Sequence, residues 1–200
     1  MNSALKIKTL LQEHLPAKAL SYCFDLWQSH PFHFKLKKSR NSKLGDYRYN
    51  PKDKSHTITL NHDLNKYSFL VTYIHEVAHL ITYLEFGRKV PPHGREWKNN
   101  FKRLFIPVLN NEVLPDSILR TLANHLKNPK ASSCADPTLY RTLSQFDEEP
   151  KVFLSDINIG SSFKLGNRVF RKEKLRRTRY VCEEIKTGRK YLISKSAQIK

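Results

Sequence analysis

An eight-residue stretch near the middle of the chain constrains the fold more than any other feature. Residues 73–80 read Tyr-Ile-His-Glu-Val-Ala-His-Leu, so His75, Glu76 and His79 form the pattern H-E-x-x-H. Two histidines four positions apart lie on one face of an α-helix, where both imidazoles can reach a single metal ion. The glutamate between them can then act as general base toward a water molecule at that metal. The motif therefore predicts a buried catalytic helix.

The surrounding residues favour a helix over residues 69–86, because this segment contains neither Pro nor Gly. At helical spacing, His75 and His79 lie roughly opposite an apolar stripe, and Glu76 lies beside them. The helix would then have one side for core packing and another for a metal. The alternative interpretation is a buried helix whose two histidines are only hydrogen-bonded in the core. The apolar stripe consists of Leu70, Ile74, Val77, Ile81 and Leu84.

A third ligand is required, because a catalytic zinc ion usually has three protein ligands. Thr82 and Glu85 stand where the pattern H-E-x-x-H-x-x-G-x-x-H needs Gly and His, so that class is excluded. The next histidine, His93, follows two prolines and precedes Gly94, which permits a tight turn before a second helix. An ordinary loop histidine is the alternative interpretation of His93. The rival third ligands are Glu96 and Glu112.

The order H-E-x-x-H, then a loop, then Pro-His93-Gly94-x-x-Trp97 resembles the SprT-like family. These zinc metallopeptidase-type proteins include the eukaryotic Spartan proteases, which act on proteins crosslinked to DNA. The resemblance extends over roughly residues 5–105 and implies a minimal zincin-like metallopeptidase fold. It also implies that Glu76 is the catalytic base. By the same resemblance, the zinc ligands are His75, His79 and His93.

The sequence of predicted elements indicates an α+β domain. A turn is expected at Gly45-Asp46, a loop at residues 128–137, and Pro107 should end or kink the helix that contains it. The strands are predicted at residues 32–37, 47–50 and 56–60. The helices are predicted at residues 3–15, 16–27, 69–86, 95–110, 115–126 and 138–146.

An acidic break at residues 147–150 separates this domain, residues 1–150, from a segment of different texture. Residues 151–200 favour two β-hairpins, with turns at Gly166-Asn167 and at residues 186–189. Many members of the resembled family carry a cysteine-rich zinc ribbon after the catalytic domain. Here Cys182 is the single cysteine of the segment, and one thiolate cannot build that site. We therefore expect a small basic β-rich segment that resembles a zinc ribbon without its cysteines.

Positive charge is concentrated in this C-terminal segment. The chain carries 36 Lys and Arg against 18 Asp and Glu, and residues 151–200 hold 14 of the former and 4 of the latter. Such a distribution predicts a surface for DNA, single-stranded or distorted duplex, apart from the chemistry. The alternatives are a solvated basic face and, for Phe170, Tyr180 and Tyr191, core packing instead of base stacking. The candidate nucleic-acid contacts are Arg168, Arg171, Lys172, Lys174, Arg176, Arg177 and Arg179.

Several features that the sequence lacks argue against a membrane-spanning or secreted protein. No apolar run approaches the roughly 18 residues of a membrane-spanning helix, and the first residues do not form a signal peptide. The three cysteines include no C-x-x-C pair, which fits a reducing compartment. We therefore expect a cytoplasmic protein without a membrane partner.

Three functions remain open. The favoured one is a zinc-dependent endopeptidase, with Zn²⁺ as cofactor, whose basic segment holds it on DNA so that DNA-bound or DNA-crosslinked proteins become substrates. The runner-up is a nucleic-acid-associated regulatory protein with a structural or vestigial metal site, although such a site has no need of Glu76. The third is zinc-dependent hydrolysis of a non-peptide bond. Tyr73 and Tyr83 flank the motif, but nothing in the sequence favours either as an oxyanion stabiliser.

Overall fold

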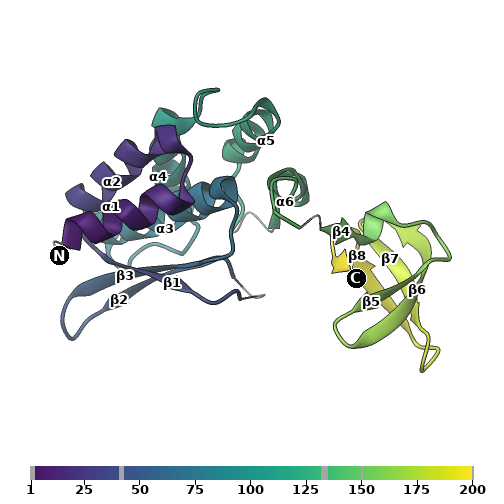
Figure 1. Ribbon diagram of the computed structural model, residues 1–200. Coiled ribbons are helices and arrows are strands. Elements are labelled where there is room, and N and C mark those ends of the chain that lie inside the picture. Colours follow the sequence, from purple (N-terminus) through teal and green to yellow (C-terminus); the bar gives the residue numbers. More distant parts are fainter. Residues whose placement is uncertain (1–2, 41–42, 132–134, 150, 200) are drawn as a thin grey trace. The chain divides into compact units, whose positions relative to one another are not determined.

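The computed structural model describes residues 3–40, 43–131, 135–149 and 151–199. The chain divides into two compact units, Met1–Phe146 and Asp147–Lys200, each with an apolar core of its own (Figure 1). The first unit combines helices with a three-stranded sheet, and the second is built mainly of strands. The chain therefore has the mixed α+β architecture that its sequence predicts.

In the first unit, helices α1, α2 and α3 cover one face of the small sheet (Figure 1). The three strands of this sheet are β1 (His33–Lys37), β2 (Gly45–Asn50) and β3 (Ser55–Asn61). The helices are α1 (Ser3–His14), α2 (Leu20–Ser29), α3 (Lys66–Phe86), α4 (Arg95–Phe105), α5 (Asp116–Lys127) and α6 (Pro137–Ser144).

Strand β3 lies at the centre of this sheet. Ile58 of β3 is opposite Phe34 of the parallel strand β1 and opposite Tyr47 of the antiparallel strand β2. The strand order β1-β3-β2 leaves β2 at an edge. Alternation along the strands buries Phe34, Ile58 and Leu60 in the core that α3 shares. The sheet thus packs against α3 and places the edge strand β2 beside that helix.

Helix α3 is the longest element and carries the H-E-x-x-H motif. The Asn65 side chain caps it by accepting the backbone N–H groups of Tyr67 and Ser68 at 3.1 and 3.0 Å. It ends at Gly87, whose φ is +61°, a conformation that glycine adopts without steric cost. The predicted apolar stripe is buried as far as Ile81, but Leu84 is 50% exposed because the last turn of the helix extends past the core.

Several predicted boundaries differ in the structure: α2 begins at Leu20 after a 3₁₀ turn instead of at residue 16, and α3 begins at Lys66 instead of at residue 69. Strand β2 begins at Gly45 instead of after a Gly45-Asp46 turn, because Gly45 already pairs with Leu60 of β3. Helix α4 ends at Phe105 and is followed by a 3₁₀ turn at Ile106–Val108. Pro107 lies in that turn and lacks the N–H group that would continue the α-helix.

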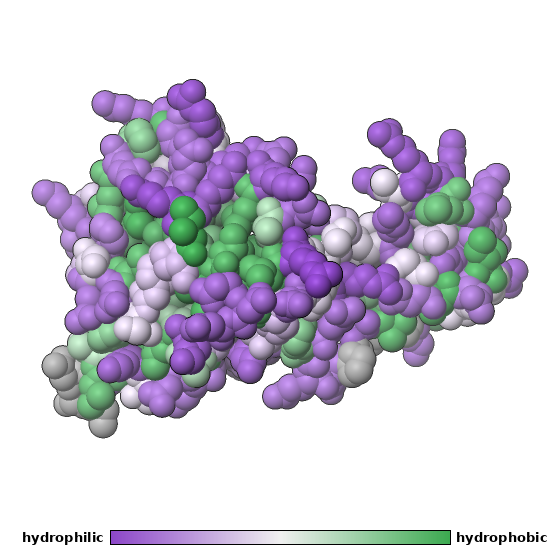
Figure 2. Space-filling model, turned by 90° about the horizontal axis from the view of Figure 1, so that it is seen from above, coloured by the Kyte–Doolittle hydropathy of each residue, from purple (hydrophilic) through white to green (hydrophobic). Residues whose placement is uncertain are grey.

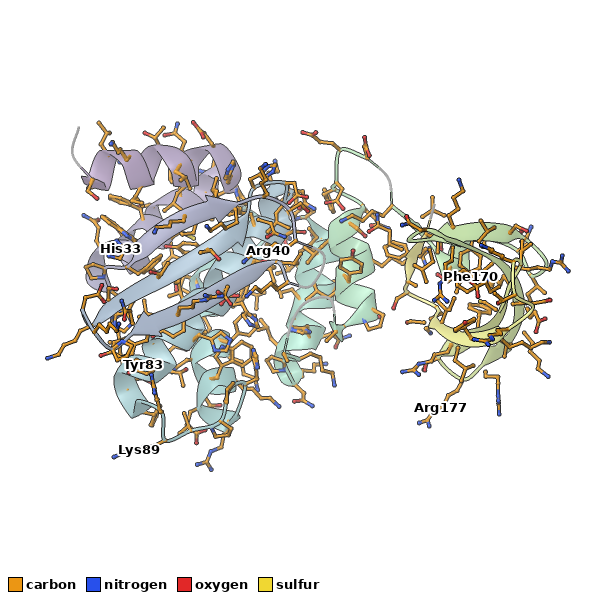
Figure 3. All side chains as sticks on the ribbon, turned by 90° about the horizontal axis from the view of Figure 1, so that it is seen from below. His33, Arg40, Tyr83, Lys89, Phe170 and Arg177 are labelled. Carbon is orange, nitrogen blue, oxygen red and sulfur yellow. The ribbon has the colours of Figure 1, made fainter. Side chains whose placement is uncertain are left out.

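The second unit is a four-stranded antiparallel sheet in the order β5-β6-β7-β8, with a short pair β4-β9. Gly166-Asn167 joins β5 and β6, as predicted, but residues 171–176 continue β6 instead of linking two hairpins. Phe170 lies among the strands and is fully buried, so it belongs to the core (Figure 3). The strands are β4 (Val152–Phe153), β5 (Ser162–Leu165), β6 (Arg168–Arg176), β7 (Arg179–Glu184), β8 (Lys190–Ser194) and β9 (Gln198–Ile199).

Hydrophilic residues cover most of the face seen in Figure 2, and apolar residues gather toward the middle of the first unit. Across the parts of the chain that the structure describes, no helix combines the length and apolarity needed to traverse a lipid bilayer.

Candidate metal centre

The structure brings His75, His79 and His93 together. The Nε2 atoms of His75 and His79 are 3.2 Å apart, and that of His93 lies 3.2 Å from the first and 3.0 Å from the second. His75 and His79 project from the same side of α3, whereas His93 comes from the loop before α4. Among the described residues, these three form the one group of His, Cys, Asp or Glu side chains arranged to hold a metal.

The geometry of this cluster fits a metal of zinc type. Tetrahedral zinc with Zn–N bonds of roughly 2.05 Å separates its nitrogen ligands by roughly 3.3 Å, close to the distances seen here. Burial and the neighbouring imidazoles hold the pKa of His75 well below its usual value and lower that of His79 to about 3. Burial also lowers the pKa of His93. Neutral imidazoles carry the lone pairs that a metal requires.

A strained turn delivers His93 to the cluster. The Gly94 N–H donates to the Pro91 carbonyl at 3.0 Å, closing a turn in which His93 has a φ of +58°. Gly or Asn usually takes such a position, and another residue costs about 1–2 kcal/mol there. A Cβ atom on Gly94 would lie 2.9 Å from both Cγ and O of Pro91, so the turn also needs this glycine. The loop therefore adopts a strained backbone conformation at His93, and this conformation places the His93 imidazole in the cluster.

Trp97 packs behind all three imidazoles. It is fully buried, and its ring lies 4.7, 5.3 and 4.7 Å from those of His75, His79 and His93. Phe101, one turn along α4, stacks on the indole at 4.9 Å. This packing fixes the imidazole orientations from the side of α4. The buried indole Nε1 has no acceptor among the described residues.

Glu76 lies against strand β2. A Cβ atom at Gly45 would come within 2.6 Å of Glu76 Oε1 and 2.7 Å of Thr72 Cγ2, so the absence of a side chain at Gly45 makes room for the carboxylate. Burial, and secondly the charge of Asp46, raises the pKa of Glu76 to about 8, although the Tyr47 backbone N–H opposes this shift by hydrogen-bonding to the carboxylate. Burial beside β2 therefore makes this carboxyl group hold its proton to a higher pH than an exposed glutamate does.

A cavity of about 740 Å³ opens onto the three histidines and Glu76. Gly45, Asp46 and Tyr47 of β2 form part of its wall, and Tyr47 lies parallel to the His79 ring at 6.5 Å. The Tyr47 hydroxyl is hydrogen-bonded to His56 Nδ1 at 2.9 Å. The edge strand thus borders both the candidate metal ligands and the carboxylate.

The two tyrosines that flank the motif have different surroundings. Tyr73 is fully buried and its hydroxyl donates to the Cys23 carbonyl at 2.8 Å, so it supports the core and does not face the cavity. Tyr83 lines the cavity near the end of α3, followed by the loop that contains Lys89 (Figure 3). The rival ligands Glu96 and Glu112 do not belong to the histidine cluster.

The predicted nucleic-acid contacts lie on β6, β7 and the turn between them, and Lys172 departs from the set. Lys172 is 2% exposed and donates to the carbonyls of Leu154 and Ile157 at 2.8 and 2.7 Å, so its ammonium is unavailable to a phosphate. The Arg168 guanidinium lies over the rings of Phe170 and Tyr191. Arg177 is at the end of the β6–β7 hairpin (Figure 3). The six exposed members are Arg168, Arg171, Lys174, Arg176, Arg177 and Arg179.

The sequence interpretation missed three contributors to the cavity. The sequence predicts a turn at Gly45 and a strand from Tyr47, and it gives His125 only a structural or exposed position. Only Gly45 left a signal, since a glycine next to a strand often marks a close approach. Tyr47 and His125 reach the cavity through tertiary packing, which local spacing does not encode.

Comparison with known proteins identifies a family for this chain. The model of the SprT-like family matches residues 13–113, a range that contains the three histidines, Glu76 and Trp97. No curated protein and no solved structure matches the chain.

Proposed function

The chain belongs to the SprT-like family, and from this premise we propose that it is a zinc-dependent endopeptidase of zincin type that acts on DNA-associated proteins. The observation that carries the proposal is the cluster of three neutral imidazoles with Glu76 beside it, open to one cavity. A structural metal site would need neither the carboxylate nor the cavity.

His75, His79 and His93 would hold the zinc ion through their Nε2 atoms. A zinc ion there would act as a Lewis acid toward a peptide carbonyl and a water molecule. Trp97 keeps the imidazoles in place and excludes water from the α4 side of the cluster. The remaining steps fall to the residues around the cavity.

Glu76 would act as general base and then as general acid. Its carboxylate takes a proton from the water that attacks the peptide carbonyl carbon. The resulting carboxyl group then gives that proton to the amine nitrogen as the C–N bond breaks. Burial raises the pKa of Glu76 above that of an exposed glutamate and so brings it closer to the working pH, which favours a group that first takes and then gives a proton.

Strand β2 would position the substrate. It is an edge strand, and its residues Gly45 to Tyr47 line the cavity. An extended peptide can add to such an edge through main-chain hydrogen bonds. A peptide bound along β2 would pass beside Glu76, which lies against the same strand.

The second unit would hold the enzyme on DNA. Its exposed arginines can neutralise phosphates, and this support is electrostatic because Phe170 is buried and unavailable for stacking. Proteins bound or crosslinked to the same DNA would then be presented to the cavity at high local concentration.

The variant Glu76→Gln tests the proposed chemistry. We expect it to bind zinc as the wild type does and to lose cleavage of casein, histone and itself, measured with and without single-stranded DNA. Glu112→Gln is the matched control, because Glu112 is exposed and outside the cluster. Zinc content is measured on all three proteins. Cleavage by Glu76→Gln at the wild-type rate would contradict the mechanism, and an inert but zinc-loaded wild type would favour the regulatory alternative.

A further inference from the structure

A second histidine site lies in the same cavity. His125 of α5 lines the cavity, yet its side chain is only 2% exposed. Its Nδ1 is 2.8 Å from Oδ2 of Asp136, the residue that precedes α6. Neither residue belongs to the histidine cluster described above. The pair is therefore a dyad of a buried imidazole and a partly exposed carboxylate that the proposed chemistry does not use.

Asp136 fixes which ring nitrogen carries the proton. Its Oδ1 accepts the backbone N–H groups of Thr138 and Leu139 at 3.1 and 3.2 Å, so the carboxylate cannot rotate freely. Burial opposes ionisation, but the bond to His125 and these two N–H groups together hold the pKa of Asp136 below its usual value. An ionised carboxylate only accepts, so Nδ1 donates, and in the Nδ1–H tautomer the lone pair of the ring is on Nε2.

The dyad is one ring removed from the candidate metal ligands. The His125 ring lies 6.3 Å from Phe101, which in turn lies 5.7 Å from His75. With Phe101 between them, the His125 side chain does not reach a metal held by His75. It can instead contact a substrate side chain next to the scissile bond. No described residue hydrogen-bonds Nε2, which leaves that atom as the polar group that the ring can present to the cavity.

We propose that His125, oriented by Asp136, determines specificity by accepting a hydrogen bond from a substrate side chain that flanks the scissile bond. The inference rests on the proposed endopeptidase function. Among the described residues of the cavity wall, Phe101 lies beside His125 with its ring centroid 6.3 Å away, and it offers no hydrogen bond to a side chain that enters there. A donor such as an amide is then favoured over an apolar isostere, because the isostere leaves a buried acceptor unpaired.

The test uses the zinc-loaded full-length chain and competing peptides with Asn, Asp or Leu at each position around one cleavage site. These side chains are nearly isosteric, but Asn donates, Asp only accepts and Leu does neither. At one flanking position the wild type should prefer Asn to Leu by about tenfold or more in kcat/KM. His125→Phe should abolish this preference, and His33→Phe, an exposed control (Figure 3), should keep it. Competing peptides share one sample, so the ratio does not depend on how much enzyme is folded.

Asp136→Asn provides a second variant that keeps the helix cap. The amide oxygen still accepts the two backbone N–H groups, but its NH₂ group then faces Nδ1 and moves the ring proton to Nε2. The cavity would present a donor, so peptides with Asp should gain relative to those with Asn. Imidazole ¹⁵N shifts of the same proteins should report the Nδ1–H tautomer of His125 in the wild type and the Nε2–H tautomer in Asp136→Asn.

The outcomes separate the two proposals. Cleavage by the wild type with an Asn-to-Leu ratio that His125→Phe leaves unchanged would overturn the specificity role and leave the endopeptidase standing. A wild-type His125 in the Nε2–H or doubly protonated form would overturn it too, whatever the activity. A wild type that cleaves no peptide, with the expected tautomer, would overturn the endopeptidase and with it the substrate contact, but not the dyad.

Discussion

At the scale of single residues, Gly45 ties the sheet to the candidate base. Gly45→Ala should displace the Glu76 carboxylate, because the new Cβ would lie 2.6 Å from Oε1. Loss of a positioned general base lowers kcat by roughly 10²- to 10⁴-fold. Peptide cleavage and zinc content measured side by side check this, with Asn50→Ala at the exposed end of β2 as control. Lost cleavage with retained zinc is the expected result, and full activity would mean that Glu76 is not held by β2.

Lys172 is the residue for which the sequence predicts the wrong role, a contact with DNA. It was grouped with the DNA-binding cations because it lies in a basic run, but its ammonium is buried and donates to two carbonyls. Lys172→Met should destabilise the second unit by about 1–3 kcal/mol, since both carbonyls lose their donor. Urea unfolding followed by a probe in that unit measures the loss. Lys174→Met, the exposed control, should change stability by less than about 0.5 kcal/mol.

At this scale, most residues of the candidate metal centre could be predicted from the sequence. His75, Glu76 and His79 follow from helical spacing, and His93 follows from the next available histidine after a proline-rich loop. Gly45 and His125 could not be predicted as part of the site. Gly45 contributes through the contact of β2 with α3, and His125 lies on α5, some thirty residues after His93 in the chain. Local patterns report which residues share a face, and they do not report which faces meet.

At the scale of elements, helices with strong periodicity and caps were the most predictable. Helix α3 ends at the predicted residue 86, but it begins at Lys66, three residues before the predicted start, because the Asn65 side chain caps it there. Strand β2 was misjudged at its start, because the pairing of Gly45 with Leu60 depends on a partner strand. The sequence likewise does not show that β6 continues through residues 171–176, because the pairing of this charged run with β7 depends on a partner strand.

The β6–β7 hairpin provides the element-scale test of DNA binding. Arg176, Arg177 and Arg179 are exposed around its turn, and Arg176 pairs with Arg179 across it. Replacing all three with Gln should lower the slope of log K against log salt by roughly 2 for single-stranded DNA, at about 0.7 per lost phosphate contact. Fluorescence anisotropy at several salt concentrations measures it. Gln at Lys18, Lys52 and Lys54, exposed lysines of the first unit, is the charge-matched control.

An equal loss of slope in both triple variants would mean that net charge alone drives binding, and an unchanged slope in the hairpin variant would place the DNA elsewhere. Either result would leave the proposed chemistry intact, because the three arginines and the candidate metal ligands belong to different units.

At the scale of the whole molecule, the two units should differ in what stabilises the fold of each one. The first has a core built around α3, into which Trp97 and the candidate metal ligands are packed. The second has a small core around Phe170 and Cys182 and no cysteine cluster, so its folding should not depend on metal. Zinc that binds only the folded first unit stabilises it by mass action, about 4 kcal/mol when free zinc is a thousandfold above Kd.

Removal of zinc should therefore separate the unfolding transitions of the two units in a thermal scan. We expect a chelator to lower the Tm of the first unit, reported by Trp27 and Trp97 fluorescence, because both tryptophans lie in that unit. The Tm of the second unit, followed through its backbone amide NMR signals, should not move. His93→Ala should abolish the chelator effect on the first unit while leaving the second unchanged. A single transition that shifts as one with zinc would instead mean that the units unfold cooperatively, and the metal would then stabilise the DNA-binding surface as well as the cavity.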